Sequence, residues 1–351
     1  MRANIYVLGG NGNVGSEFVR QVVNKDLDKL RIIGLASIEG YIYNPKGIKK
    51  EDALKFTKNE IPIKEHPGLD ELLNEVINDF SEEEIIFVDI TAGKGLFLEL
   101  HKRIIKETNF KIVTANKNPL SFCNFETFNF LTHDLRRYGY RVTVMAGAES
   151  IYFLRDLREL KEDVYEIQGC FSGTLGYITS ELEKGRKLSE VVKEAKMKGY
   201  SEPHPRDDLN GLDVARKLLI LARTLGMKVD LDDIIIEPFI PYEYLQEEDD
   251  SSFLNNLREL NGVFEEKFQD AMKKGNVLRY IASYKNNKFE VSLREIPKES
   301  PLGILKGTRN KFVVYSESYN KENYYCVEAP GAGPRIAAMN LRRDIINILN
   351  L

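Results

Sequence analysis

Three glycines near the start of the chain have the spacing of a dinucleotide-binding turn. Gly10, Gly12 and Gly15 form a GxGxxG sequence between a short apolar run and a helical pattern. In this setting the first glycine makes a tight turn, the second lets the backbone approach a pyrophosphate, and the third lets helix and strand pack closely. Backbone N–H groups at the start of the helix then bind the phosphates. The motif predicts a dinucleotide site formed by Gly10, Gly12, Asn13, Val14 and Gly15.

The residues after the next predicted strand bear on which dinucleotide binds. An acid at this point bonds the ribose 2′-hydroxyl of NAD, whereas a basic residue accepts the 2′-phosphate of NADP. Ser37 is followed by Ile38 and Glu39, and the next basic residue is Lys46. We expect Ser37 and Glu39 to lie at the ribose of NAD or NADP, and the pattern favours NAD.

A carboxylate and an ammonium group four residues apart could take part in proton transfer. Asp213 and Lys217 fall on one face of a predicted helix, residues 211–225, beside its apolar stripe. In one interpretation the lysine donates a proton to a developing alkoxide. In the other, the two form an ordinary surface ion pair worth a few tenths of a kcal/mol. Lys117 is a second candidate, because it follows a predicted strand and ligands of parallel sheets bind at the carboxyl ends of strands.

The elements that position these residues alternate in the first 145 residues. Continuous apolar runs predict buried strands, and patterns of period 3.6 predict helices. The strands are expected at 4–8, 31–36, 85–89, 111–114 and 141–145, and the helices at 14–23, 68–80, 96–107 and 125–138. Such alternation predicts a doubly wound parallel sheet with helices on both faces.

The rest of the chain has a different pattern, typical of an α+β layer. Its strands are expected at 164–171, 277–284, 288–293, 311–316 and 324–328, and its helices at 175–182, 188–198, 211–225 and 250–272, with a final helix ending at 349. An acidic run at 247–250 is interpreted as a solvated loop at a helix start. The protein is therefore expected to be of the α/β class with two domains.

Composition narrows the classes of function. A chain of 351 residues exceeds the size of a single hydrophobic core, and 50 Lys and Arg against 54 Asp and Glu give a net charge of −4. This balance argues against nucleic-acid binding and against a polybasic membrane surface. No apolar run is long enough to cross a bilayer and no leader-like segment opens the sequence. Three scattered cysteines and four histidines without ligand spacing argue against a disulfide framework and a zinc site. We expect a cytoplasmic protein.

Residues 199–217, GYSEPHPRDDLNGLDVARK, closely resemble the signature of the homoserine dehydrogenases. VTANK at 113–117, Gly173-Thr174, PLGILKG at 301–307 and PGAG at 330–333 match the same family in the same order, so the resemblance covers essentially the whole chain. It implies reversible reduction of L-aspartate 4-semialdehyde to L-homoserine with NAD(P)H, in the biosynthesis of threonine, methionine and isoleucine. We expect the short, monofunctional form.

The resemblance also implies a fold and a set of site residues. The family fold predicts a Rossmann domain at 1–150, an α+β catalytic domain at 151–315 that forms a homodimer, and a segment at 316–351 whose helix returns to the nucleotide domain. Lys117 and Lys217 match the proposed catalytic lysines, with Asp213 beside Lys217. The residues expected at the amino-acid substrate are Glu202, Asp208, Asp213, Gly173 and Thr174. Those expected at the cofactor besides the glycine turn are Ser37, Glu39, Thr91, Ala92, Lys117 and Gly331.

Two segments depart from the family pattern. His204 stands where the family usually has Asp, within the substrate stretch. Family members also hold Na⁺ or K⁺ with backbone carbonyls of a glycine-rich run after the last Rossmann strand. The matching carbonyls here are those of Val144, Ala146 and Ala148, but the run lacks the family's Glu, Pro and consecutive glycines.

Two other functions stay open on sequence alone. The chain could be another nicotinamide-dependent semialdehyde or amino-acid dehydrogenase, or a catalytically silent dinucleotide sensor. The first alternative, in its acyl-phosphate form, needs a nucleophilic cysteine with a nearby histidine, which the sequence does not offer. The second predicts loss of the Asp213–Lys217 pair and of the acidic stretch before it, and both are present.

Overall fold

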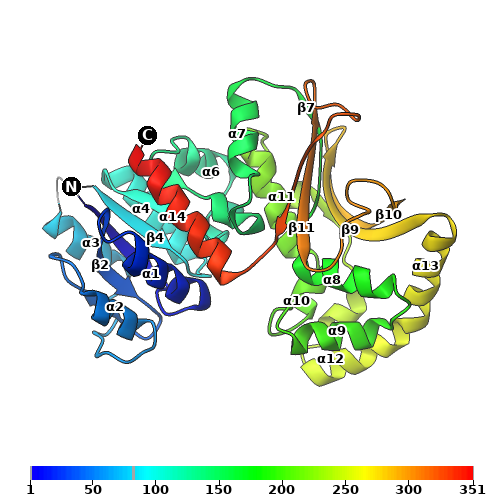
Figure 1. Ribbon diagram of the computed structural model, residues 1–351, viewed down its shortest axis with the longest axis horizontal. Helices are drawn as coiled ribbons and strands as arrows, with labels where there is room; N and C mark the ends of the chain where they lie inside the picture. The colour runs from blue at the N-terminus through cyan, green and yellow to red at the C-terminus, as the bar shows by residue number, and fades with distance from the viewer. Residues whose placement is uncertain (1, 81–83, 351) are drawn as a thin grey trace. The chain divides into compact units, whose positions relative to one another are not determined.

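The computed structural model describes residues 2–80 and 84–350 and divides into two compact units. One unit comprises Met1–Ile151 with Ala332–Leu351, and the other comprises Tyr152–Gly331. Figure 1 shows the order of the elements along the chain.

The first unit contains a six-stranded sheet in the order β3-β2-β1-β4-β5-β6. Every neighbouring pair is parallel except β2 and β3. The strands are β1 (Ala3–Leu8), β2 (Leu30–Ala36), β3 (Tyr41–Tyr43), β4 (Ile85–Asp89), β5 (Lys111–Thr114) and β6 (Tyr138–Gly139). The helices are α1 (Asn13–Lys25), α2 (Lys50–Phe56), α3 (Leu69–Asp79), α4 (Gly95–Glu107), α5 (Asn118–Ser121), α6 (Phe125–Thr132) and α14 (Pro334–Asn350). The predicted doubly wound Rossmann sheet is confirmed, with its switch point between β1 and β4.

The last helix, α14, completes the core of the first unit beside α1 (Figure 1). Leu341 and Ile345 are fully buried with the apolar side of α1 and the central strands. The Arg342 guanidinium also binds the carboxylate of Asp26, with Nη2 2.9 Å from Oδ1. The predicted return of the C-terminal helix to the nucleotide domain is confirmed.

Residues 141–145 do not form the strand that the sequence predicts. They fold into two 3₁₀ turns, η1 (Arg141–Thr143) and η2 (Met145–Gly147). Met145 and Ala146 have φ of 52° and 50°, a left-handed conformation that no strand contains. The buried Arg141 pairs with Asp344 of α14 at 3.0 Å, a contact 203 residues away in sequence. The parallel strand is instead β6, a few residues earlier.

The second unit contains a six-stranded sheet in the order β12-β11-β7-β9-β10-β8, with only β8 and β10 parallel. The strands are β7 (Val164–Cys170), β8 (Ile234–Ile236), β9 (Asn276–Lys285), β10 (Lys288–Pro297), β11 (Arg309–Ser316) and β12 (Tyr325–Pro330). The helices are α7 (Ile151–Glu159), α8 (Gly173–Leu182), α9 (Leu188–Met197), α10 (Arg206–Leu209), α11 (Leu212–Thr224), α12 (Asp250–Asn256) and α13 (Asn261–Lys273). Because α8, α11 and α13 pack on the sheet, the predicted α+β domain is confirmed.

Two boundaries in this unit differ from the sequence expectation. The single helix expected at 250–272 is two helices, α12 and α13, joined by a 3₁₀ turn at Leu257–Leu260. Strand β12 pairs with β11, so residues 316–331 belong to the second unit and the returning segment begins at Ala332.

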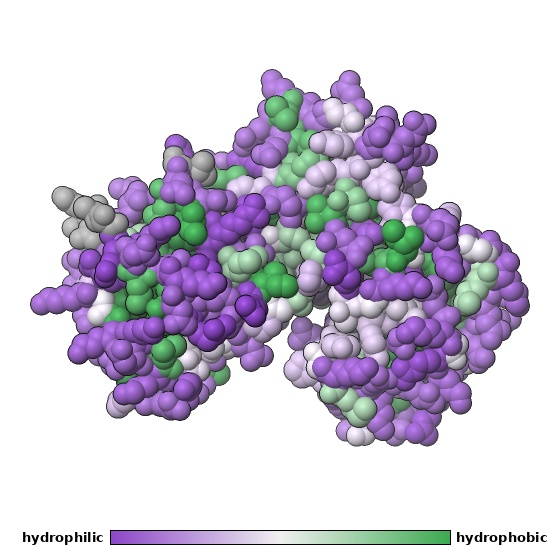
Figure 2. Space-filling model, in the orientation of Figure 1, coloured by the Kyte–Doolittle hydropathy of each residue, from purple (hydrophilic) through white to green (hydrophobic). Residues whose placement is uncertain are grey.

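The surface is mainly hydrophilic on the face that Figure 2 shows. Apolar side chains of the strands are buried instead, as in β1, where Ile5, Tyr6 and Val7 have no exposed area. Among the described residues, no helix combines the length and the apolarity needed to span a bilayer.

Candidate active site

The turn after β1 has the backbone geometry of a phosphate-binding loop. Gly9 adopts φ of +85°, and the N–H groups of Gly9 and Gly10 both donate to the carbonyl of Ala36. A Cβ at Gly15 would lie 1.9 Å from the carbonyl oxygen of Gly9. Gly9, the residue before the motif, therefore adopts the left-handed conformation in this turn, and Gly15 permits the predicted close approach of helix and strand.

The start of α1 offers its N–H groups to a ligand. Gly12 is the N-cap and provides no side-chain cap, so no side-chain oxygen occupies the helix end. Within 4 Å, a Cβ at Gly12 would meet only the carbonyl oxygen of Gly9, at 3.5 Å, so the backbone at the helix start is not crowded at this position. Uncapped N–H groups at the positive end of a helix dipole suit an anionic phosphate. These residues fit the pyrophosphate of a dinucleotide.

Glu39 lies beside this turn. Its Oε2 accepts a hydrogen bond from the Asn11 amide at 2.9 Å, although 28 residues separate the two in sequence. The Ser37 hydroxyl, 3.2 Å from the Glu39 N–H, is the largest influence that lowers the pKa of the exposed Glu39 carboxyl. A negative charge therefore stands next to the glycine turn, where the ribose of a dinucleotide binds in this fold.

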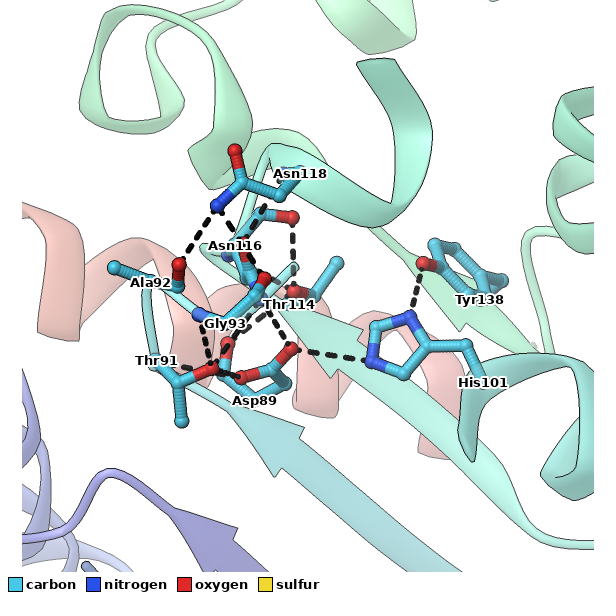
Figure 3. A network of polar contacts seen from close by, with 9 residues as sticks. All are labelled: Asp89, Thr91, Ala92, Gly93, His101, Thr114, Asn116, Asn118 and Tyr138. Atoms are coloured by element: carbon cyan, nitrogen blue, oxygen red, sulfur yellow. Dashed lines mark hydrogen bonds and ion pairs between the residues drawn. The ribbon is translucent and has the colours of Figure 1, made fainter. Parts of the chain in front are cut away.

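Thr91, Ala92 and Lys117 lie on two neighbouring loops at the carboxyl ends of β4 and β5. Hydrogen bonds from Asn116 and Asn118 tie the two loops together, as Figure 3 shows. Lys117 is the N-cap residue of α5 and is half-buried. The carboxyl ends of parallel strands are where ligands bind in this fold.

Lys217 of α11 is held from two sides within the second unit. Its Nζ lies 2.8 Å from Asp213 Oδ2 and donates to the carbonyl of Phe171 at 2.6 Å. Its side chain is only 12% exposed. Because an ammonium group has three N–H bonds and the described residues give it these two acceptors, one N–H is available for a ligand oxygen.

Asp208 is the centre of a group of carboxylates near α11. Its Oδ1 lies 2.7 Å from the Thr174 hydroxyl, and its Oδ2 accepts from the N–H of Glu202 at 2.8 Å. Burial raises the pKa of Asp208 to about 6, and repulsion by the carboxylates of Glu202 and Asp213 adds to this rise, against the two hydrogen bonds. A site with clustered negative charge suits an ammonium group.

The start of α8 brings Gly173 and Thr174 to the same place. Ser172 caps the helix by accepting from the N–H of Leu175 at 3.1 Å. A Cβ at Gly173 would lie 3.0 Å from the carbonyl oxygen of Thr308, so the glycine lets the helix pack against that backbone. Thr174 is buried, and its hydroxyl also lies 2.6 Å from the carbonyl oxygen of Tyr200.

His204, which stands where the family usually has Asp, anchors the loop before α10. Its Nε2 donates to the carbonyl of Glu248 at 3.2 Å, and Arg206 donates to the carbonyl of Glu247 at 2.9 Å. The acidic run thus holds the loop through backbone carbonyls, while Asp249 caps α12. The run was expected to be a solvated loop, and the structure adds this anchoring role.

The backbone carbonyls expected to hold a monovalent cation are hydrogen-bonded within the chain. The carbonyls of Val144 and Ala148 accept N–H groups from residues three and two positions further on. The carbonyl of Ala146 accepts from the Asn340 amide at 2.9 Å. Each of these carbonyls therefore already has a hydrogen-bond partner within the chain, and no chemical step is assigned to a cation here. Within the described residues, no group of three or more His, Cys, Asp and Glu could hold a metal.

Gly331, the residue after β12, is closely packed. A Cβ there would lie 2.2 Å from Oδ1 of the buried Asn310, so any side chain would displace that residue. The packing of the chain thus requires a glycine at position 331, apart from the cofactor role that the sequence predicts for it.

The structure brings Glu202, Asp208, Asp213, Lys217, Gly173 and Thr174 together within one unit, and the glycine turn, Glu39, Thr91 and Lys117 within the other. Sequence reasoning missed the carbonyls of Phe171 and Tyr200, because a backbone group carries no residue-type signal. It also missed Asn11, which stands at a variable position of the glycine motif.

A family model described as homoserine dehydrogenase matches residues 151–346, more than half of the chain. The chain belongs to the homoserine dehydrogenase family. It is 31% identical over 360 residues to a bifunctional aspartokinase/homoserine dehydrogenase from Buchnera aphidicola subsp. Acyrthosiphon pisum. That match covers 97% of this chain and 42% of the relative, so the chain spans less than half the length of this relative.

Solved structures support the same fold. A Candida auris protein of unknown function shares 29% identity with a TM-score of 0.87, covering 99% of this chain and 98% of that one. A hyperthermophilic archaeal homoserine dehydrogenase in complex with NADPH has a TM-score of 0.76 at 22% identity, covering 100% of this chain and 98% of that one. Because the identity to the archaeal enzyme is only 22%, this similarity shows a shared fold and nothing more.

Proposed function

We propose that this chain is a homoserine dehydrogenase that interconverts L-aspartate 4-semialdehyde and L-homoserine with a nicotinamide cofactor. The observation that carries the proposal is the geometry around Lys217, which is held by Asp213 and the Phe171 carbonyl beside clustered carboxylates. An amino-acid aldehyde needs a proton donor for its carbonyl oxygen and negative charge for its α-ammonium group. Both are present in one unit of a chain of this family.

A bound nicotinamide cofactor supplies the hydride to the aldehyde carbon in reduction and accepts it in oxidation. As the carbon–oxygen double bond opens, the Nζ of Lys217 donates a proton to the oxygen, and the lysine regains a proton from solvent. Asp213 keeps the ammonium group oriented through its 2.8 Å ion pair. Glu202 and Asp208 bind the α-ammonium group of the substrate, and Gly173 and Thr174 line that end of it. Lys117 is proposed as a second cationic group for the developing charge.

The proposed cofactor site comprises the glycine turn, the start of α1, Ser37, Glu39, Thr91, Ala92 and Gly331. The NADPH in the archaeal neighbour supports a nicotinamide dinucleotide as the class of cofactor. The Glu39 carboxylate beside the turn repels a 2′-phosphate and can bond a 2′-hydroxyl. We therefore propose that NAD(H) is used at least as well as NADP(H).

We further propose a homodimer formed through the second unit, as the resemblance implies. Light scattering on the purified chain would test this. A mass of two chains is expected, and a single-chain mass would reject the dimer.

Product analysis tests the proposed activity. The purified chain is incubated with L-aspartate 4-semialdehyde and NADH or NADPH, and the product is identified by chromatography against L-homoserine. Formation of L-homoserine in proportion to cofactor oxidised is expected. Another reduced amino acid formed from a related semialdehyde, with none from this one, would favour a different dehydrogenase. Cofactor binding without turnover of either would favour a dinucleotide sensor.

A further inference from the structure

The carboxylate of Asp89 is fully buried at the end of β4 and meets donors on both oxygens. Oδ1 accepts from the N–H of Thr91 at 2.9 Å and from its hydroxyl at 2.7 Å. Oδ2 accepts from the Asn116 amide at 3.0 Å and faces Nε2 of His101 at 3.2 Å. Because a buried carboxylate is costly without partners, these three hydrogen bonds and the close contact with the His101 imidazole offset the cost of burying Asp89.

His101 connects this carboxylate to a buried tyrosine. Its Nδ1 lies 2.7 Å from the hydroxyl of Tyr138 on β6. Burial raises the pKa of Tyr138 well above its usual value, so that hydroxyl keeps its proton. When Tyr138 donates to Nδ1, the imidazole proton is left on Nε2, where it faces the Asp89 carboxylate at 3.2 Å. Tyr138, His101 and Asp89 are thus linked by one hydrogen bond and one close polar contact.

The same carboxylate holds the two loops that carry predicted cofactor residues. The Asn116 side-chain amide, which donates to Asp89, also donates to the carbonyl of Gly93 at 2.9 Å. Asn116 Oδ1 accepts from the N–H of Asn118 at 3.1 Å, and the Asn118 amide donates to the carbonyl of Ala92 at 2.8 Å. Lys117 lies between these two asparagines in sequence. Figure 3 shows this network, in which the Asp89 carboxylate contacts Thr91, Asn116 and His101.

We propose that Asp89 and His101 are positioning residues that fix the Thr91–Ala92 segment and the backbone of Lys117 for cofactor binding and hydride transfer. The inference rests on the proposed function for its catalytic part. Neither side chain reaches a ligand itself, since His101 is 1% exposed and Asp89 has no exposed area. They act through Thr91 and Asn116, and a misplacement of about 1 Å at a reacting group can cost on the order of 10²-fold in rate.

The test compares His101→Leu with His101→Gln and Asp89→Asn. The glutamine of His101→Gln keeps an N–H donor for Asp89, whereas the leucine of His101→Leu removes it. In Asp89→Asn, the new amide N–H group would face the groups of Thr91 and Asn116 that now donate to the carboxylate. A matched control is Thr132→Val, which removes another buried hydrogen bond of the same unit, to the Phe128 carbonyl. Calorimetry measures the dissociation constant of NAD(H) and NADP(H), steady-state assays measure kcat, and thermal unfolding measures stability.

We expect His101→Leu and Asp89→Asn to weaken cofactor binding and lower kcat, each by on the order of tenfold or more. His101→Gln should recover most of both, and Thr132→Val should lower stability without changing either. Cofactor binding and kcat within twofold of wild type in folded His101→Leu would overturn the inference, as would equal kinetic losses in Thr132→Val.

Nitrogen-15 NMR of the wild-type chain gives a reading that needs neither activity nor a variant. The inference predicts the Nε2–H tautomer of His101 at about pH 8, and the Nδ1–H tautomer would contradict it. If the wild-type chain does not turn over L-homoserine, the proposed function fails, whereas the NMR and calorimetry still decide the role of Asp89 and His101. If Asp89→Asn does not fold, the two His101 variants decide.

Discussion

At the residue scale, Lys217 is the side chain on which the proposed chemistry depends most. Lys217→Ala should lower kcat by about 10²–10⁴-fold, the range for loss of a positioned proton donor. Steady-state kinetics in both directions measure this. Lys193→Ala, at an exposed lysine of α9, serves as the control and should leave kcat unchanged. Near wild-type turnover of Lys217→Ala would move the proton role to Lys117 or to water.

The raised pKa of Asp208 predicts how substrate binding depends on pH. Its pKa of about 6 means that the carboxylate is neutralised as pH falls below that value. The KM for L-homoserine should then rise by up to about tenfold per pH unit, because a neutral acid cannot pair with the ammonium group. The effect on stability has the opposite direction. Because the pKa of Asp208 is raised in the native state, its protonation stabilises the fold, and this contribution to the free energy of unfolding is lost as pH rises through about 6. A KM that is constant between pH 5 and 7 would reject Asp208 as a binding group.

Glu39 sets the expected choice between cofactors. Glu39→Arg should raise the ratio of kcat/KM for NADP(H) to that for NAD(H) by about tenfold, because a guanidinium pairs with the 2′-phosphate. Glu39→Gln removes only the repulsion and should have a smaller effect in the same direction. A wild-type chain that already prefers NADPH by tenfold or more would show that Glu39 does not face the ribose.

At the scale of elements, the helix α14 is expected to stabilise the nucleotide unit although it is the last element of the chain. Leu341→Ala should cost about 2–5 kcal/mol of unfolding free energy, because its side chain is fully buried. Leu349→Ala in the same helix is the control and should cost far less, since Leu349 is 38% exposed. The thermal transition to follow is the one whose midpoint temperature rises when NAD(H) is added, because that transition belongs to the unit that binds the cofactor. Equal effects of the two variants would contradict this role for the helix.

Elements with a strong local pattern could be predicted from sequence, and those fixed by distant contacts could not. The buried strands β1, β2, β4 and β5 and the glycine turn follow from continuous apolar runs and glycine spacing. The 3₁₀ turns at 141–147 depend on Arg141 meeting Asp344, and no local signal records that pair. The short elements β3 and α2 have too few periodic positions to be recognised.

The candidate site divides in the same way. The GxGxxG sequence and the 199–217 stretch could be read directly, because residue type and spacing carry their chemistry. The link from Asp89 to His101 and Tyr138 could not, since it joins a strand, a helix and a second strand through buried side chains. The anchoring of His204 by the carbonyl of Glu248 was hidden for the same reason.

At the scale of the whole molecule, the central claim is that the chain oxidises L-homoserine and that Lys217 handles the proton. The most direct measurement is the absorbance of reduced nicotinamide after L-homoserine is added to the purified chain with NAD or NADP separately. The account predicts a saturable rate that requires L-homoserine, is at least as fast with NAD as with NADP, and falls in Lys217→Ala. A folded chain that binds NAD(H) but reduces neither cofactor with L-homoserine would contradict it.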